Sequence, residues 1–183
     1  MPIAHSRLFR GYLDSHLGRI NLLLNAEGAL VRLDFSLPEH FDPWPQYLDA
    51  ILDQQVAADA CAQLREYLNG TRRDFDVPLA PAGSVFLKEA WALLRSVPYG
   101  TTTTYGELAK AMSKPSSARA IGMANAVNPI SIIVPCHRVI AATGHLTGYS
   151  GGLDKKRGLL MLEAEYSRAD LASTPRWTGS PSI

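Results

Sequence analysis

The segment IIVPCHRVI, residues 132–140, places a cysteine directly before a histidine and an arginine. A cation next to a thiol favours the thiolate, which is the nucleophilic form of cysteine. Cys136 is therefore a candidate nucleophile, and a buried cysteine with a purely structural role is the alternative. The other cysteine, Cys61, falls inside an apolar pattern of helical spacing and is expected to act as a small buried hydrophobe.

His137 is the candidate base beside this thiol. Neighbouring side chains of an extended strand point to opposite faces, so we expect His137 to act on Cys136 through a water molecule unless the chain turns. Such a histidine commonly needs a carboxylate that orients its ring. Glu163, in a helical pattern near the C-terminus, is a candidate, although sequence alone favours a solvated helix charge at this position.

A glycine-rich loop, Tyr149-Ser150-Gly151-Gly152, precedes that last helical pattern. Glycines allow a backbone to approach a flat ligand closely, so the loop is a candidate for one wall of a binding site. A plain turn before a helix is the more common meaning of the same residues.

Composition indicates a folded, soluble protein. The chain has 183 residues, of which 46% are hydrophobic and 19% charged, enough for one large or two small domains. No apolar run approaches the roughly 18 residues of a membrane span, and the N-terminus lacks the apolar core of a secretory signal. We therefore expect a cytoplasmic protein with no membrane partner. Two cysteines are too few for a structural zinc site, so no metal is expected.

Charge is distributed unevenly along a chain whose net charge is only +1. Residues 1–83 hold 7 Lys+Arg and 11 Asp+Glu, whereas residues 84–183 hold 11 and 6. A basic C-terminal half could face a polyanion, although a difference of this size is common between unrelated domains.

The N-terminal part predicts a small domain of residues 1–82. Hairpin turn residues at 14–18 and 25–28 separate three short strands, which predicts an antiparallel sheet. Apolar spacing over 47–68 predicts one long helix that ends at Asn69–Gly70. The segment 73–83 is expected to form a strand and then a linker.

The C-terminal part, residues 83–166, predicts a mainly helical domain. Ser84 is a candidate N-cap for a helix over 84–97, and Thr104 with Glu107 forms a capping box before the next helix. Two helices joined by the short turn at 113–117 suggest a DNA-binding helix-turn-helix, with an ordinary helical hairpin as the alternative. An apolar strand precedes Cys136, a last helix covers 153–165, and the tail 167–183 is expected to be mobile. The fold class is α+β.

Four segments in order, TTYGELA, ARAIG, NPISIIVPCHRVI and GYSGG, resemble those of the DNA alkyltransferases that repair 6-O-alkylguanine, the methylated-DNA–protein-cysteine methyltransferase family. The resemblance covers residues 84–165. The N-terminal half is similar to the family's ribonuclease H-like domain only in size, strand pattern and the helix before the linker. The resemblance implies a single-turnover repair protein that acts as a monomer, needs no cofactor and binds double-stranded DNA from the minor groove.

The resemblance also implies roles for the residues that carry chemistry. Cys136 matches the thiol that accepts the alkyl group, His137 the base that acts through a water, and Glu163 the carboxylate that orients the histidine. Asn128 matches a hinge asparagine that ties the recognition helix to the active-site segment. Tyr105 matches the tyrosine that gives a proton to the departing guanine and crowds the target phosphate.

Further residues match the family's DNA and base contacts. Arg119 matches the finger that fills the place of the extruded base, and the pocket for that base matches Val139, Tyr149, Ser150 and Gly151. Lys114 and Ser116 are candidate phosphate contacts. The expected substrate is 6-O-methylguanine, with 4-O-methylthymine as a second lesion. A non-catalytic recognition protein of the same fold and an alkylation-responsive regulator are the alternatives.

Overall fold

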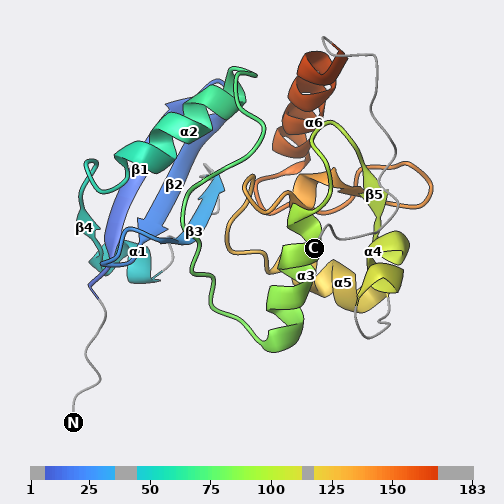
Figure 1. The fold of residues 1–183 in the computed structure, drawn as a ribbon, viewed down its shortest axis with the longest axis horizontal. Helices are drawn as coiled ribbons and strands as arrows, with labels where there is room; N and C mark the ends of the chain where they lie inside the picture. The colour runs from blue at the N-terminus through green and yellow to red at the C-terminus, as the bar shows by residue number, and fades with distance from the viewer. Residues whose placement is uncertain (1–6, 36–44, 113–117, 169–183) are drawn as a thin grey trace. The chain divides into compact units, whose positions relative to one another are not determined.

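The computed structural model describes residues 7–35, 45–112 and 118–168. The chain divides into two compact units, residues 1–82 and 83–183 (Figure 1). The first unit contains a sheet and helices, and the second is mainly helical, so the predicted α+β class is confirmed.

The first unit is built on a four-stranded sheet in the order β3-β2-β1-β4. Strands β1 (Phe9–Ser15), β2 (Gly18–Leu24) and β3 (Leu30–Phe35) pair antiparallel, as the hairpin spacing predicts. Gly18 and Gly28 have φ angles of 115° and 78°, which is why glycine is favoured at these two turns. Strand β4 (Ile51–Leu52) is a short edge strand that runs parallel to β1.

The two faces of this sheet differ because side chains alternate along each strand. One face buries Leu13, Leu22, Leu24, Leu33 and Phe35. The helix α2 (Ala58–Leu68) runs along β1, where a side chain in place of Gly11 would collide with Ala57 just before α2 begins (Figure 1). The apolar face therefore forms the core of this unit.

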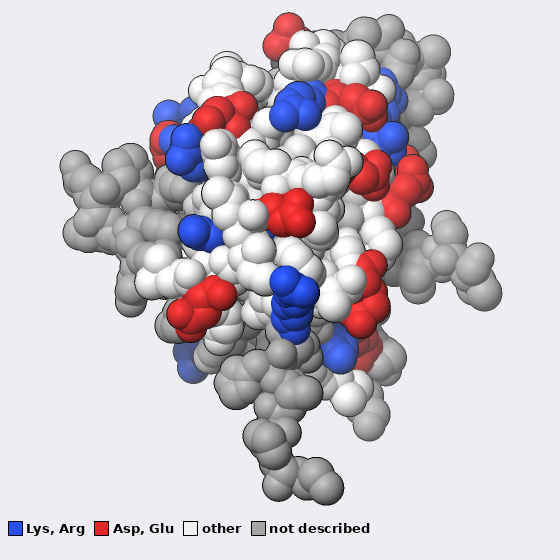
Figure 2. Space-filling view, turned by 90° about the vertical axis from the view of Figure 1, so that its left-hand side faces the viewer, with Lys and Arg blue, Asp and Glu red and all other residues white. Residues whose placement is uncertain are grey.

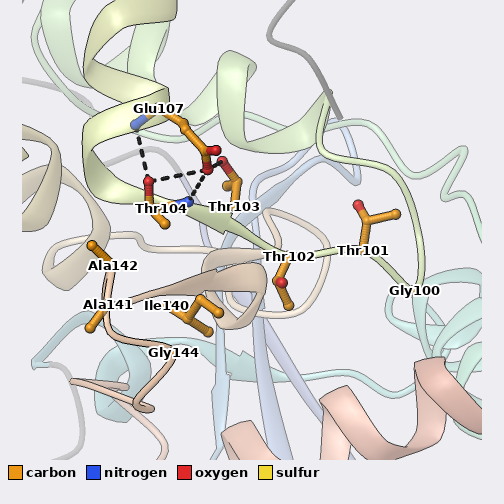
Figure 3. A pocket seen from close by; sticks show the side chains of 10 residues that line it. All are labelled: Gly100, Thr101, Thr102, Thr103, Thr104, Glu107, Ile140, Ala141, Ala142 and Gly144. Carbon is orange, nitrogen blue, oxygen red and sulfur yellow. Dashed lines mark hydrogen bonds between the residues drawn. The ribbon is translucent and has the colours of Figure 1, made fainter. Parts of the chain in front are cut away.

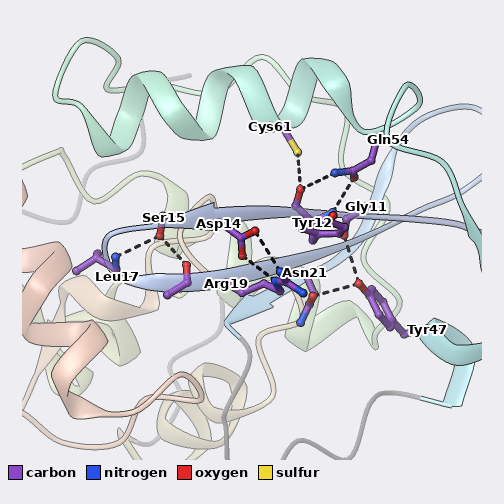
Figure 4. A network of polar contacts seen from close by, with 11 residues as sticks. Gly11, Tyr12, Asp14, Ser15, Leu17, Arg19, Asn21, Tyr47, Gln54 and Cys61 are labelled. Carbon is purple, nitrogen blue, oxygen red and sulfur yellow. Dashed lines mark hydrogen bonds and ion pairs between the residues drawn. The ribbon is translucent and has the colours of Figure 1, made fainter.

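The other face carries a polar network (Figure 4). Arg19 Nε donates to Asp14 Oδ1 at 2.7 Å. The hydroxyl of Tyr47, in helix α1 (Pro45–Asp49), donates to Asn21 Oδ1 at 3.1 Å. On the apolar side of the sheet, Cys61 of α2 donates to the backbone carbonyl oxygen of Tyr12 at a sulfur–oxygen distance of 3.7 Å. The buried, structural placement expected for Cys61 agrees with this geometry.

Two predictions for the first unit are wrong. The single helix predicted over 47–68 is interrupted by β4 and a turn, because Gln54 binds both the N–H and the carbonyl of Tyr12 and Asp53 accepts from the N–H groups of Gln55 and Val56. The strand predicted after residue 73 is only an isolated bridge between Leu30 and Leu79.

The second unit contains α3 (Val85–Arg95), α4 (Tyr105–Ala111), α5 (Ala118–Ala126) and α6 (Leu153–Arg168). The Ser84 cap and the Thr104–Glu107 capping box are both present, so each helix begins where the sequence predicts. Helices α3, α4 and α5 pack against one another. A parallel pair of short strands, β5 (Thr103–Thr104) and β6 (Val139–Ile140), joins the start of α4 to the segment that follows Cys136. Helix α6 continues to Arg168, and the rest of the predicted tail lies outside the described residues.

The apolar strand predicted before Cys136 is wrong. Residues 131–133 form a turn in which Ile132 has a φ of 71°, and Cys136–Arg138 form a 3-10 turn, η1. The extended-backbone geometry expected for Cys136 and His137 therefore does not apply. No helix in the described part of the chain is long and apolar enough to cross a membrane.

Candidate active site

Cys136 lines a cavity of about 270 Å³ in the second unit. The other walls come from Tyr105 on α4, from α5 and from the loop before α6. In addition to Cys136 and Tyr105, the lining residues are Gly122, Asn125, Ala126, Gly148, Tyr149 and Ser150. Drug-sized sites span roughly 300–1,000 Å³, so this cavity suits a smaller ligand such as a single nucleobase. Cys136 itself is only 2% exposed, so a ligand reaches the thiol through the cavity.

Asn128 fixes the backbone that leads to Cys136. Its side-chain Nδ2 donates to the carbonyl of Val134 at 2.8 Å, and its Oδ1 accepts from the N–H of Ile130 at 3.1 Å. Both ends of the turn around Ile132 are thus held by one buried side chain. Because Asn128 lies two residues beyond the end of α5, its side chain connects the end of this helix to the cysteine segment.

His137 and Glu163 form a fully buried pair behind the cavity. His137 Nε2 lies 2.8 Å from Glu163 Oε1, and both side chains are 0% exposed. An ionised carboxylate only accepts hydrogen bonds, so Nε2 carries the ring proton and Nδ1 is the nitrogen that can accept one. Burial lowers the pKa of His137 below its ordinary value, and this effect outweighs the raising effect of Glu163. His137 is therefore neutral and competent as a base at neutral pH.

Arg138 neutralises the same carboxylate. Its Nε lies 3.1 and 3.0 Å from the two Glu163 oxygens, and its terminal Nη2 lies 2.9 Å from Oε1. Arg138 also donates to the carbonyl of Val97, and the N–H of Gly100 donates to Glu163 at 3.0 Å. Burial acts to raise the pKa of Glu163, but His137 and Arg138 together hold it far below the ordinary value, so Glu163 is ionised. The Glu163 carboxylate therefore fixes the orientation of the His137 ring and of the Arg138 guanidinium.

Lys156 is a second buried cation in this unit. Its side chain donates to the carbonyls of Val139 and Thr147, both at 2.6 Å, and lies 3.5 Å from that of Gly148. These contacts fasten the loop before α6 to the strand that follows η1. Burial lowers the pKa of Lys156, while the nearby Cys136 acts to raise it.

The remaining predicted residues divide into three groups. Tyr105, Tyr149 and Ser150 lie together around the cavity, with the Tyr105 hydroxyl 3.3 Å from Thr147 Oγ1. Val139 and Gly151 are buried but are not among the lining residues, and Arg119 is exposed on α5. The predicted phosphate contacts Lys114 and Ser116 lie outside the described residues.

Sequence reasoning missed three residues of this site. Lys156 reads as one of three consecutive cations, but its spacing from Leu159 and Glu163 places all three on one helix face, and that face is buried. The sequence marks Arg138 only as a cation beside the thiol, although its main partner is Glu163. Asn125, in the wall of the cavity, is flanked by small residues and gives no signal in the sequence.

A larger cavity of about 500 Å³ lies elsewhere in the second unit (Figure 3). Its walls come from the threonine-rich segment before α4 and from the chain after β6, and they comprise Gly100, Thr101, Thr102, Thr103, Thr104, Glu107, Ile140, Ala141, Ala142 and Gly144. Among the described residues that line it there is no cysteine or histidine, and the carboxylate of Glu107 accepts from the N–H of Thr104 at 2.8 Å. The smaller cavity, which the cysteine lines, is therefore the candidate site. Within the described ranges, no group of three or more His, Cys, Asp or Glu could hold a metal ion.

Known proteins share both units of this chain. The family described as "6-O-methylguanine DNA methyltransferase, DNA binding domain" matches residues 85–165, and its "ribonuclease-like domain" matches residues 8–81. The "Methylated-DNA--protein-cysteine methyltransferase" of Mycobacterium tuberculosis is 49% identical over 159 residues, which cover 87% of this chain and 94% of the relative.

Solved structures agree with the sequence comparison. The crystal structure of Mycobacterium tuberculosis O6-methylguanine methyltransferase has a TM-score of 0.81 at 40% identity, covering 90% of this chain and 97% of the other. A structure of the Mycobacterium tuberculosis protein in complex with DNA has a TM-score of 0.76 at 39% identity, covering 86% and 94%. The resemblance seen in four sequence segments thus extends over most of the chain, which belongs to the 6-O-methylguanine DNA methyltransferase family.

Proposed function

We propose that this protein repairs DNA directly by moving an alkyl group from the 6-oxygen of guanine to the sulfur of Cys136. The observation that carries the proposal is a thiol that lines a base-sized cavity and is followed by a buried His137–Glu163 pair. The names of the relatives are those of methyltransferases, which supports this function over a non-catalytic recognition protein or an alkylation-responsive regulator.

The reaction is an in-line displacement at the alkyl carbon. The Cys136 sulfur forms a bond to that carbon as the bond from carbon to the 6-oxygen breaks, and the thiol proton passes through a water to His137 Nδ1. The Tyr105 hydroxyl, in the cavity wall, gives a proton to the departing guanine. The product is a thioether with no good leaving group, so Cys136 is not regenerated and each molecule reacts once. No step needs a metal or a cofactor.

Glu163 and Asn128 act as positioning residues in this proposal. Glu163 keeps the proton of His137 on Nε2, so that the lone pair of the ring that can take up the thiol proton is on Nδ1. Asn128 fixes the turn that presents Cys136 to the cavity. Val139 and Gly151 shape the surrounding backbone, while Tyr149 and Ser150 form part of the wall that receives the base.

DNA is the proposed partner, approached through α5. A 6-O-alkyl group lies inside the stacked duplex, so the nucleotide must swing out before a thiol reaches it. The exposed Arg119 is suited to fill the vacated place, which offsets part of the lost stacking. Small residues dominate the rest of α5 and allow a close approach to the minor groove, with Lys114 and Ser116 as further phosphate contacts.

The face viewed in Figure 2 is less suited to DNA. On the face viewed in Figure 2, positive and negative side chains are interspersed among the described residues, so that face presents no extended basic field. We place the protein in the cytoplasm as a monomer, where both free thiols stay reduced, and include 4-O-methylthymine as a second lesion.

Mass analysis of the intact protein tests the proposal. Incubation with a duplex that carries one 6-O-methylguanine should add the mass of one methyl group, on the peptide that contains Cys136, and never more than one per molecule. Arg119→Ala should slow this transfer from duplex by roughly tenfold, because flipping loses its wedge, while transfer from the free methylated base is unchanged. Arg157→Ala, an exposed cation on α6, is the matched control. Repeated turnover, or no methyl on Cys136, would contradict the proposal.

A further inference from the structure

The hydroxyl of Tyr105, which gives a proton to the departing guanine in the proposed reaction, has a partner beside the cavity. It lies 3.3 Å from the Oγ1 of Thr147, in the loop before α6, and either oxygen can be the donor. Tyr105 and Gly148 line the cavity, and Thr147 lies next to this lining without being part of it. Thr147 therefore reaches the Tyr105 hydroxyl without occupying the space of the base.

The backbone of Thr147 is held by a buried cation. The ammonium group of Lys156 donates to the carbonyl oxygens of Thr147 and Val139, both at 2.6 Å, and Lys156 is 0% exposed. A charged donor forms shorter and stronger hydrogen bonds than a neutral one. Val139 belongs to β6, and β6 pairs with β5, which ends directly before Tyr105. The loop that carries Thr147 and the start of α4 are thus tied to the same short strand.

The ring of Tyr105 is held from its own side. Tyr105 is the first residue of α4, and the capping box of Thr104 and Glu107 fixes this helix end. Helix α5 approaches the ring at Gly122, where an added Cβ would lie 3.9 Å from Tyr105 Cδ1, an ordinary packing distance. The distance between the two hydroxyl groups is therefore set by two segments that are anchored separately.

The direction of this hydrogen bond decides what Tyr105 can do. A hydroxyl has one proton and two lone pairs. If Tyr105 donates to Thr147, the phenolic proton is engaged and must turn before it can be transferred. If Thr147 donates to Tyr105, the phenolic proton is left for the base, and the same hydrogen bond stabilises the phenolate that remains after the transfer. Proton donation to the departing guanine therefore favours the second arrangement.

We infer that Thr147 is a positioning residue, which donates a hydrogen bond to the Tyr105 oxygen during methyl transfer. As the carbon–sulfur bond forms and the bond from the methyl carbon to the 6-oxygen breaks, the Tyr105 proton moves to the departing guanine and the phenolate accepts from Thr147. The phenolate then takes up a proton from water, as His137 releases the one that it received from Cys136. This role deepens the proposed function and rests on it.

The contact between the two hydroxyl groups is exposed in the free protein, so water competes with it there. A base in the cavity and DNA above it exclude this water, and a hydrogen bond is stronger in the drier environment. We therefore expect the contribution of Thr147 to appear in the rate of methyl transfer from duplex, with the free energy of unfolding largely unchanged.

Single-turnover rates of methyl transfer, measured on the full chain with a saturating 6-O-methylguanine duplex, test this role. Thr147→Val keeps the shape of the side chain but removes the hydroxyl, and should slow transfer by roughly three- to tenfold, as expected for one hydrogen bond. Thr147→Ser keeps the hydroxyl and should stay within about twofold of the wild-type rate. The matched control, Thr143→Val, removes a hydroxyl of the same loop that lies 3.0 Å from His145, and should also stay within about twofold.

Two further measurements separate this role from general support of the site. In a Tyr105→Phe background, Thr147→Val should change the rate less than about twofold, because the acceptor of its hydrogen bond is gone. Methyl iodide methylates a thiol with a leaving group that needs no proton. Thr147→Val should therefore react with methyl iodide at Cys136 as fast as the wild-type protein, measured by mass analysis of the peptide that contains Cys136.

The outcomes distinguish this inference from the proposed function. A wild-type rate in Thr147→Val, or a Thr147→Ser variant that is equally slow, would overturn the inference, because the hydroxyl would not be the group that matters. Equal slowing with and without the Tyr105 hydroxyl, or with both methyl donors, would also overturn it. In each of these cases Cys136 would still accept a methyl group from duplex. Absence of that transfer in the wild-type protein would overturn the proposed function itself.

Discussion

The two cysteines of this chain are almost equally buried, at 4% exposed for Cys61 and 2% for Cys136, yet their surroundings differ in kind. Cys61 lies on α2, and its thiol bonds a backbone carbonyl of the adjacent strand. Burial raises the pKa of the Cys61 thiol and outweighs the lowering effect of Arg65. Cys136 instead lines a cavity and is followed by the buried His137 and Arg138. Burial alone therefore does not tell a reactive cysteine from a structural one.

The same contrast extends to the charges of the two units. In the first unit the ion pair of Arg19 and Asp14 is exposed, with 50% and 64% of the side chains accessible. In the second, Arg138 and Glu163 pair with 7% and 0% accessible. Buried ion pairs are weak evidence for stability, because desolvation offsets much of their attraction. Their concentration around Cys136 is better explained by the chemistry that they position.

The largest expected effect on methyl transfer comes from replacing each of the two cysteines in turn. Cys136→Ser should take up no methyl group from methylguanine duplex, because an alcohol next to a neutral histidine is a far weaker nucleophile than a thiol. The variant should still bind the duplex. Cys61→Ser should accept one methyl group at a rate close to that of the wild-type protein. Intact-protein mass measures the uptake, and a folded Cys61→Ser variant that takes up none would remove the contrast between the two cysteines.

Glu163→Gln should have the next largest effect. The substitution preserves the shape of the side chain but leaves Arg138 buried without a carboxylate, which should lower the free energy of unfolding by about 3–5 kcal/mol. The transfer rate should fall by about 10- to 100-fold, because His137 loses the group that fixes its tautomer. Urea unfolding and single-turnover rates measure the two effects.

The matched control for that substitution is Glu165→Gln, two residues along the same helix and exposed. It should change neither quantity. Equal stability of Glu163→Gln and Glu165→Gln would mean that the buried carboxylate is not the centre of the network.

A smaller effect is expected from pH. The pKa of His137 is lowered in the folded protein, so below about 6.5, the ordinary value, the unfolded chain binds a proton that the folded protein does not. The free energy of unfolding should therefore be constant above this pH and fall as the pH drops, by at most about 1.4 kcal/mol per pH unit from this group. The lowered pKa of Glu163 adds a second loss below its ordinary value of 4.5.

The charged groups around His137 set the direction of this dependence. Glu163 favours its protonation, while burial and the cations Arg138 and Lys156 oppose it. His137→Gln should remove the slope between pH 5 and about 6.5, whereas His145→Gln, at an exposed histidine, should retain it. Urea unfolding at several pH values measures the slope. An identical slope in wild type and His137→Gln would show that other groups titrate in this range.

Much of the fold follows from local signals in the sequence. The turn glycines, the Ser84 cap and the Thr104–Glu107 box each act through their own backbone neighbours, and each is present where predicted. The errors occur where distant contacts decide. Gln54 breaks the predicted long helix by binding Tyr12, and Asn128 bends an apolar segment rich in β-branched residues by binding both of its ends.

The site shows the same division. Cys136, His137 and Glu163 could be named because their segments match a specific family pattern, and the pair of His137 and Glu163 is in place at 2.8 Å. The places of Lys156 and Asn125 in the site depend on what the folded chain brings to them. Lys156 contacts three carbonyl oxygens from two segments, and Asn125 lines a cavity. Neither environment can be predicted from the residues adjacent in the sequence.

The smallest expected effect is that of Cys61→Ala, which tests the structural side of the contrast. The carbonyl of Tyr12 that accepts from the Cys61 thiol also accepts from Gln54 Nε2 at 3.1 Å, so it keeps a partner when the sulfur is removed. Only packing around one buried atom is lost, and the free energy of unfolding should fall by about 1 kcal/mol. Methyl transfer should stay within about twofold of the wild-type rate. A loss of stability as large as that of Glu163→Gln would contradict the contrast between the two cysteines. A single thiol on α2 would then contribute as much to stability as the buried charges beside Cys136.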